Sequence, residues 1–114
     1  MEVGHGVFVS SLSTDQWEPD PDVGGEMHNL CRGVGLSRYV DGPVNLVEYT
    51  MPERESFLVL EGHARIEIAD GPTLELKAGD FASIPAGAKT TWHITVPYRE
   101  FWVFGSVADE NKQL

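Results

Sequence analysis

The sequence has little positive charge, one cysteine and no long apolar run. Its eight lysines and arginines are scattered among eighteen acidic residues, and the formal charge of the 114 residues is −10. This balance argues against binding to nucleic acid or to an anionic membrane, because both need clustered basic side chains. Cys31 has no partner for an internal disulfide, which is compatible with a reducing compartment. We interpret it as a small buried apolar residue in preference to a nucleophile.

Segments that would direct the chain out of the cytoplasm are missing too. No stretch approaches the roughly 20 apolar residues that cross a bilayer. The N-terminus has an acidic Glu2, no basic region and only a short apolar run, so it does not read as a secretory signal. We therefore expect a cytoplasmic protein, and the length predicts one domain with one core.

Histidines are few and widely spaced. No two of the four have the i, i+2 or i, i+4 spacing of a metal site, and they stand at His5, His28, His63 and His93. A histidine metal cluster is therefore not expected. Alternation along the strand turns His93 away from Trp92, so we favour an outward surface or interface histidine over a base in a cavity.

The residues that are present predict an all-β fold. From Gly33 onward, short segments rich in β-branched and aromatic residues alternate with turn clusters, and no apolar 3.6-residue period persists. Eight strands in so short a chain suit a closed barrel or jelly roll. The predicted strands are Val34–Tyr39, Val44–Thr50, Ser56–Leu60, Ala64–Ala69, Thr73–Lys77, Phe81–Ile84, Thr90–Thr95 and Glu100–Phe104.

The predicted strands divide the chain into an arm, a barrel and a tail. We expect an N-terminal arm and acidic loop packing on the barrel over 1–32, the barrel over 33–106 and a polar tail over 107–114. The Pro-, Gly- and Asp-rich stretch from Ser13 to Glu26 is either a lid over a cavity, with Trp17 packing downward, or an acidic entry arm. We favour the arm. The final strand is apolar on both faces, which predicts that it is covered on both sides and favours a homodimer.

The most informative stretch is Gly79-Asp-Phe-Ala-Ser-Ile-Pro-Ala-Gly87. Gly79 permits a tight turn, Pro85 ends strand pairing and Gly87 lets the chain reverse. This spacing resembles a motif of the cupin superfamily, and the resemblance extends over roughly Gly33 to Phe104. Together with Phe57-Leu-Val-Leu-Glu-Gly62 and Thr91-Trp92, the stretch is similar to small bacterial cupins of the ethanolamine-utilisation and ureidoglycine-aminohydrolase group. The resemblance implies an all-β cupin barrel, a double-stranded β-helix jelly roll.

The resemblance also indicates where a metal would be bound. Cupins that bind metal use two histidines and a glutamate of one motif and a histidine of a second. The matching positions here hold Glu48, Thr50, Glu55 and Thr90, and an alternative spacing of the first motif gives Tyr49 and Met51 for the two histidines. Because imidazole is missing, we predict no metal and no cofactor, with a weakly held Mg or Ca ion at Glu48 and Glu55 as the alternative.

These positions give the predicted site. If Glu55 projects into an apolar barrel, burial raises its pKa and makes it a general acid or base, or a ligand anchor. The alternative is a rim carboxylate paired with Arg54 or Arg99. The predicted ligand-binding residues are Glu48 for charge, Thr50 and Thr90 for hydrogen bonds, and Trp92 as an apolar wall or simply core packing.

The resulting functional prediction is a cupin that binds a small polar molecule in its barrel. Carboxylates in the cavity would favour cations, amines or polyols over anions. Whether the protein is an enzyme stays open: a hydrolase, isomerase or lyase using Glu55 is one alternative, and a non-catalytic sensor or assembly module with a filled barrel is another. Phe57, Phe81 and Trp92 are the bulky side chains that would fill it.

Overall fold

Every element of the computed structural model, which describes residues 1–105, is a β-strand. The strands are β1 (Glu2–Gly4), β2 (Val7–Phe8), β3 (Glu18–Pro19), β4 (Glu26–Cys31), β5 (Val34–Tyr39), β6 (Val44–Thr50), β7 (Glu55–Ile68), β8 (Thr73–Lys77), β9 (Phe81–Ile84) and β10 (Lys89–Phe104). The predicted all-β class is confirmed. Across this range no helix is long and apolar enough to cross a membrane.

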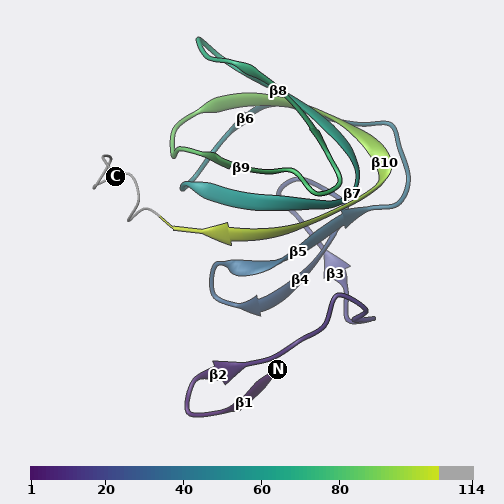
Figure 1. The fold of residues 1–114 in the computed structure, drawn as a ribbon, viewed down its shortest axis with the longest axis vertical. Coiled ribbons are helices and arrows are strands. Elements are labelled where there is room, and N and C mark those ends of the chain that lie inside the picture. The colour runs from purple at the N-terminus through teal and green to yellow at the C-terminus, as the bar shows by residue number, and fades with distance from the viewer. Residues whose placement is uncertain (106–114) are drawn as a thin grey trace.

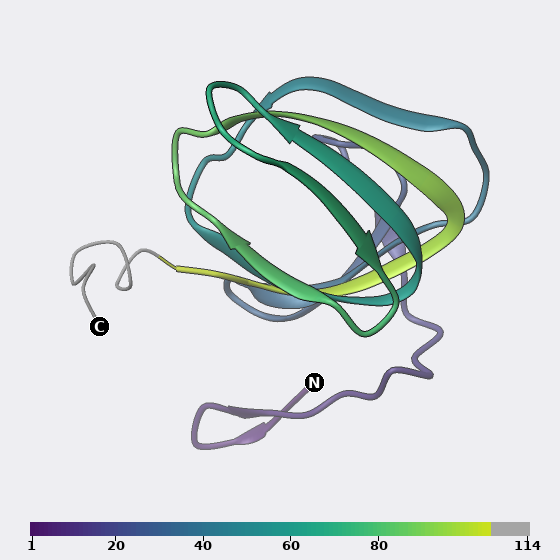
Figure 2. The same cartoon turned by 45° about the horizontal axis from the view of Figure 1, so that its top comes forward.

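The two longest strands, β7 and β10, hold the barrel together. They pair antiparallel along their lengths, and each has different partners in its two halves. The first half of β10 pairs with β6 and its second half with β5, while β7 pairs first with β9 and then with β8. The paired long strands therefore run through both faces of a jelly roll, visible as the curved ribbons of Figures 1 and 2.

Each long strand replaces two shorter strands of the sequence prediction. The chain continues through Gly62, where φ is 85° and an added Cβ would lie 2.4 Å from the carbonyl oxygen of Pro97. Only glycine fits so close an approach with a positive φ. The pairing register shifts in the same region, between Thr95 and Arg99. The long strands thus bend at this crossing and continue from one face into the other.

The N-terminal boundary of the sheet differs from the expected one. Strands β5, β6, β8 and β9 coincide with their predicted ranges. However, β4 lies in the segment predicted to be arm and loop, and it pairs with β5 from Glu26 to Cys31. β3 adds to the edge of β4. The sheet therefore begins before residue 33, and the predicted tail over 107–114 lies outside the described residues.

The core fills the space between the two faces. Val59, Ala64 and Ile66 are fully buried, whereas Arg65 between the last two is exposed, which confirms the predicted alternation. The rings of Phe57 and Trp92 pack with centroids 5.3 Å apart. Further buried members are Tyr39, Met51, Ile84, Ile94, Tyr98 and Trp102.

The outer face of β7, β9 and β10 carries an apolar groove. Phe81, expected to point inward, is 80% exposed, since its partner in the register is Leu58 on the outer side of β7. The groove is lined by these residues together with Phe101 and Val103. In the single chain, the second half of β10 therefore buries only the side chains that face the core. Coverage of the outer face by a second copy stays a prediction.

The N-terminal segment lies along the outside of the barrel. The β1–β2 hairpin projects away from it (Figures 1 and 2). The ring of Trp17 packs under the guanidinium of Arg38, whose Cζ is 4.2 Å from the ring centroid, and the Trp17 indole donates a hydrogen bond to the carbonyl of Thr14. Trp17 therefore does not enter the barrel. Only residues 20–23, further along the segment, reach its mouth.

Candidate functional site

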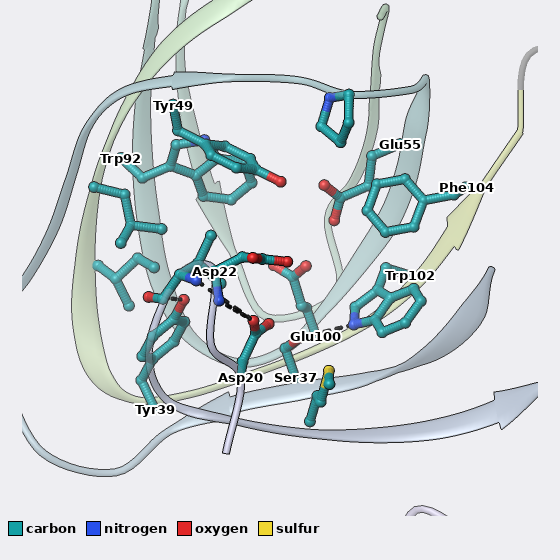
Figure 3. A pocket seen from close by; sticks show the side chains of 15 residues that line it. Asp20, Asp22, Ser37, Tyr39, Tyr49, Glu55, Trp92, Glu100, Trp102 and Phe104 are labelled. Atoms are coloured by element: carbon teal, nitrogen blue, oxygen red, sulfur yellow. Dashed lines mark hydrogen bonds between the residues drawn. The ribbon is translucent and has the colours of Figure 1, made fainter. Parts of the chain in front are cut away.

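A cavity of about 220 Å³ opens between the two faces of the barrel. Five aromatic side chains and four carboxylic acids contribute to its wall, as Figure 3 shows. The acids belong to β7, β10 and the segment between β3 and β4. The lining residues are Asp20, Asp22, Val23, Met27, Ser37, Tyr39, Leu46, Tyr49, Pro52, Glu55, Trp92, Ile94, Glu100, Trp102 and Phe104.

Two buried glutamates form the polar centre of the cavity. Glu55 opens β7 and Glu100 lies on the inward face of β10; each is only 6% exposed. Burial, the charge of Glu100 and a hydrogen bond to Glu100 all raise the pKa of Glu55 well above its ordinary value. Burial also raises the pKa of Glu100, although hydrogen bonds from Glu55 and Tyr98 oppose that rise. The two carboxyl groups therefore titrate as a coupled pair, and the raised pKa of Glu55 favours its protonated form as the donor of the hydrogen bond to Glu100.

Three tyrosines surround this pair. The hydroxyl of Tyr98 donates to Oε1 of Glu100 at 2.6 Å, and that of Tyr39 donates to the carbonyl of Val23 at 3.2 Å. Burial raises the pKa of Tyr39 and Tyr98 far above the usual value and that of Tyr49 to about 12, with nearby carboxylates adding to the shift. All three hydroxyls therefore keep their protons at neutral pH. Within residues 1–105 the Tyr49 hydroxyl has no hydrogen-bond partner, and Figure 3 shows it directed into the cavity.

An acidic loop forms one side of the cavity mouth. The Asp20 carboxylate accepts hydrogen bonds from the backbone amides of Asp22 at 2.9 Å and Val23 at 3.4 Å, which fixes the turn. The loop is held against the Tyr39 ring, because a Cβ on Gly25 would lie 2.6 Å from that ring. These contacts favour the lid interpretation of this segment over a detached arm, although the lid is made by Asp20 to Val23 and not by Trp17.

The chain resembles known proteins in this region and in its whole fold. A family model for the EutQ-like cupin domain matches residues 46–101, which include both glutamates of the pair. A cupin superfamily protein from Desulfitobacterium hafniense shares the fold with a TM-score of 0.56 and 15% identity, over 85% of this chain and 84% of that one. The chain has the cupin fold.

Two further solved structures support the same fold. A protein of unknown function from Rhizobium leguminosarum is 24% identical with a TM-score of 0.57, over 64% of this chain and 68% of that chain. A DUF861 family protein from Thermotoga maritima is 18% identical with a TM-score of 0.54, over 61% and 76%. A comparison with curated protein sequences finds no match. At these identities the likeness concerns the fold, so the chemistry has to come from the site itself.

The cupin motif positions in β6 do not all face the cavity. Glu48 has a φ of 55°, and the pairing of β6 with β10 gains one residue between Leu46 and Tyr49. This bulge turns Leu46 and Tyr49 inward and leaves Glu48 and Thr50 exposed. The expectation that Glu48 and Thr50 line the cavity is therefore wrong. The alternative motif spacing, with Tyr49 in the first histidine position, describes the observed register for that residue.

The remaining predicted residues lie in the barrel, with different surroundings. Glu55 and Trp92 both line the cavity, and Glu55 is paired with Glu100 in place of the suggested arginines. Thr90 is buried behind Trp92. Its hydroxyl donates to the carbonyl of Tyr49 at 2.7 Å and accepts from the Trp92 indole at 2.8 Å. Thr90 therefore positions the wall of the cavity and does not form part of it.

The residues at these positions do not fit the metal that the cupin motif implies. Only Glu55 of the four motif positions faces the cavity, and the described chain has no group of three or more His, Cys, Asp or Glu arranged to hold a metal. Glu48 lies outside, so it cannot join Glu55 around a weakly held cation. Three of the four histidines have separate partners: His93 contacts Asn45, His63 contacts Glu75, and His28 contacts Ser10 and Gln16.

Sequence reasoning missed Glu100, Tyr39, Tyr49 and the loop acids. A signal for Glu100 was present, because Tyr98, Glu100 and Trp102 alternate with period two and all three are buried. An acidic residue in the middle of an inward-facing row indicates a functional or paired carboxylate. Tyr49 was named only by the alternative motif spacing, and preferring that spacing would have required anticipating the bulge at Glu48.

Proposed function

We propose that this protein binds a small molecule in its cavity, and that the Glu55–Glu100 pair is the point of polar recognition. The observation that carries the proposal is a pair of carboxyl groups, Glu55 and Glu100, that are both buried and both line an open cavity. Burying two carboxyl groups costs free energy that apolar side chains of similar size would avoid. A pair kept at the end of an accessible cavity is therefore more consistent with a binding site than with core packing.

The size of the cavity supports a compact ligand. Its volume of about 220 Å³ exceeds the roughly 150 Å³ of an engineered protein cavity that admits benzene. A metabolite somewhat larger than benzene would fit between the aromatic walls. This open volume also argues against a filled barrel acting only as a sensor or assembly module, for which Phe81 would have to point inward.

A thermal-shift screen of small metabolites tests the proposal, with Glu55→Gln and Glu48→Gln compared side by side. Each variant removes one carboxylate, but only Glu55 lines the cavity. A ligand present at about 100 times its Kd stabilises the native state by about 2.7 kcal/mol. We expect that stabilisation to disappear in Glu55→Gln and persist in Glu48→Gln. Equal effects of both variants, or no ligand in a broad screen, would contradict it.

We further propose that binding needs no metal. Elemental analysis of the purified protein, together with thermal unfolding before and after chelation, tests this independently. Stoichiometric divalent metal and a loss of stability on chelation would overturn it.

A second candidate function is acid–base catalysis on the bound molecule. It is favoured by the raised pKa of Glu55, because a carboxyl group whose pKa is raised by burial can act as a general acid and then as a base. This would make the protein a hydrolase, isomerase or lyase. The discriminating result is a Glu55→Gln variant that still binds the ligand and no longer turns it over.

A further inference from the structure

The ionisable groups of the cavity wall that can carry charge at neutral pH are all acidic. Four carboxylic acids contribute to it, and no lysine, arginine or histidine occurs among its described lining residues. Asp22 is exposed and Asp20 half-buried, whereas Glu55 and Glu100 are buried, and Figure 3 shows all four around the cavity. Because opposite charges attract strongly where water is excluded, such a wall favours a positive ligand and repels an anion.

The aromatic residues offer faces and edges to the cavity, since most of their polar atoms are already engaged. The indole of Trp92 donates to Thr90, that of Trp102 donates to the Ser37 hydroxyl at 2.7 Å, and the Tyr39 hydroxyl donates to Val23. The ring of Phe104 packs against Trp102 with centroids 5.3 Å apart. The wall therefore presents π surface, with the Tyr49 hydroxyl as the one phenolic group left for a ligand in the described chain.

These two features together match one kind of ligand. We infer that the molecule bound in the cavity is a small organic cation, an alkylammonium whose charged head sits between the aromatic walls and faces the Glu55–Glu100 pair. The inference deepens the proposed function and rests on it. Aromatic faces attract cations through their quadrupole, and cages of such faces recognise methylated ammonium groups. The nearby carboxyl pair supplies the balancing charge.

Other small molecules fit the same wall less well. A polyol needs many hydrogen-bonding partners around it, whereas much of this wall consists of aromatic carbon. An inorganic divalent cation needs a shell of oxygen ligands, and no such cluster exists in the described chain. A purely apolar molecule would leave the carboxyl pair without a partner from the ligand.

Isothermal titration calorimetry of the full chain tests the inference with a matched pair of probes. Choline carries a trimethylammonium group and a hydroxyl, and 3,3-dimethylbutan-1-ol has the same shape with a neutral carbon in place of the nitrogen. We expect choline to bind at least about tenfold more tightly, the difference that a desolvated cation–π contact provides. Binding of the two probes with equal affinity would overturn the organic-cation inference and leave the proposed small-molecule function standing.

Variants separate the role of charge from that of packing. Glu100→Gln should weaken choline about tenfold or more and leave the neutral probe unchanged. Asp22→Asn, at the exposed mouth, should give a smaller loss in the same direction and serves if Glu100→Gln fails to fold. Glu48→Gln, outside the cavity, is the control. Failure of choline to bind to the folded wild type, or equal weakening of both probes by Glu100→Gln, would refute the inference. The metabolite screen then decides the proposed function separately.

Discussion

Replacing Thr90 by valine should weaken the barrel substantially while leaving the ligand site chemically intact. The threonine side chain is almost completely buried, and its hydroxyl links the Trp92 indole to the carbonyl of Tyr49. Valine has nearly the same shape but cannot form either hydrogen bond. The substitution therefore removes two bonds and leaves the buried indole N–H without a partner.

The magnitude follows from these two bonds. An unsatisfied buried polar group costs about 1–3 kcal/mol, so leaving two such groups without a partner should lower the free energy of unfolding by about 2 kcal/mol or more. Domains of this kind have about 5–15 kcal/mol in total, so the variant should still fold. Urea unfolding followed by tryptophan fluorescence measures the change.

Thr91→Val is the matched control. Thr91 is the next residue of β10, lies on the opposite face and makes no side-chain hydrogen bond within the described range. A Thr90→Val variant as stable as Thr91→Val, to within about 0.5 kcal/mol, would refute the reasoning. A variant of unchanged stability that had lost ligand binding would instead restore the direct ligand role expected from the sequence.

Three further predictions concern the acid pair, the strand crossing and the outer groove. The pKa of Glu55 is raised in the native state above the ordinary value of 4.5 that applies in the unfolded chain. The free energy of unfolding should therefore fall as the pH rises from 4.5 towards the raised pKa of Glu55. Glu55→Gln should make this fall less steep. Gly62→Ala should destabilise by about 2 kcal/mol or more, through its positive φ and the contact with Pro97. If the outer groove joins two copies, Phe81→Asp should convert a dimer to a monomer in light scattering.

Each of these predictions has a control. Glu48→Gln should keep the pH dependence of the wild type, and parallel profiles for Glu55→Gln and wild type would exclude the raised pKa of Glu55. Gly79→Ala also replaces a positive-φ glycine, but nothing lies within 4 Å of its added Cβ, so it should cost less than Gly62→Ala. Val47 is exposed on β6, away from the groove, and Val47→Asp should leave the mass unchanged. A wild-type protein that is monomeric in light scattering would contradict the prediction of a homodimer.

Strand positions could be predicted from the sequence where the local pattern of apolar residues matches the burial of the strand in the fold. Alternating apolar residues and glycine-containing turns located β5, β6, β8 and β9 correctly. In β6, β8 and β9 the residues of one face are shielded from solvent and those of the other are exposed. β4 has no such pattern. Its residues from Glu26 to Cys31 are mixed in polarity, and the strand exists because it pairs with β5. Pairing between distant segments leaves little trace in a single short stretch.

The site was only partly predictable for a related reason. The motif located Glu55 and Trp92, whose strands keep a regular register. Glu48 and Thr50 were misplaced because one extra residue in β6 reverses which side chains face inward. Glu100 was hidden by an interpretation of the last strand as uniformly apolar, although the pattern of buried neighbours at Tyr98 and Trp102 marks its inward position.

The bulge at Glu48 has a practical consequence for protein engineering. A designer who wished to install a metal in this barrel would follow the family motif and place histidines at 48 and 50. Both imidazoles would then emerge on the outer surface, where they could not meet Glu55. The inward positions of β6 are Leu46 and Tyr49, so a transplanted pair of ligands belongs there. Motif spacing alone is therefore an unsafe template for grafting chemistry onto this scaffold.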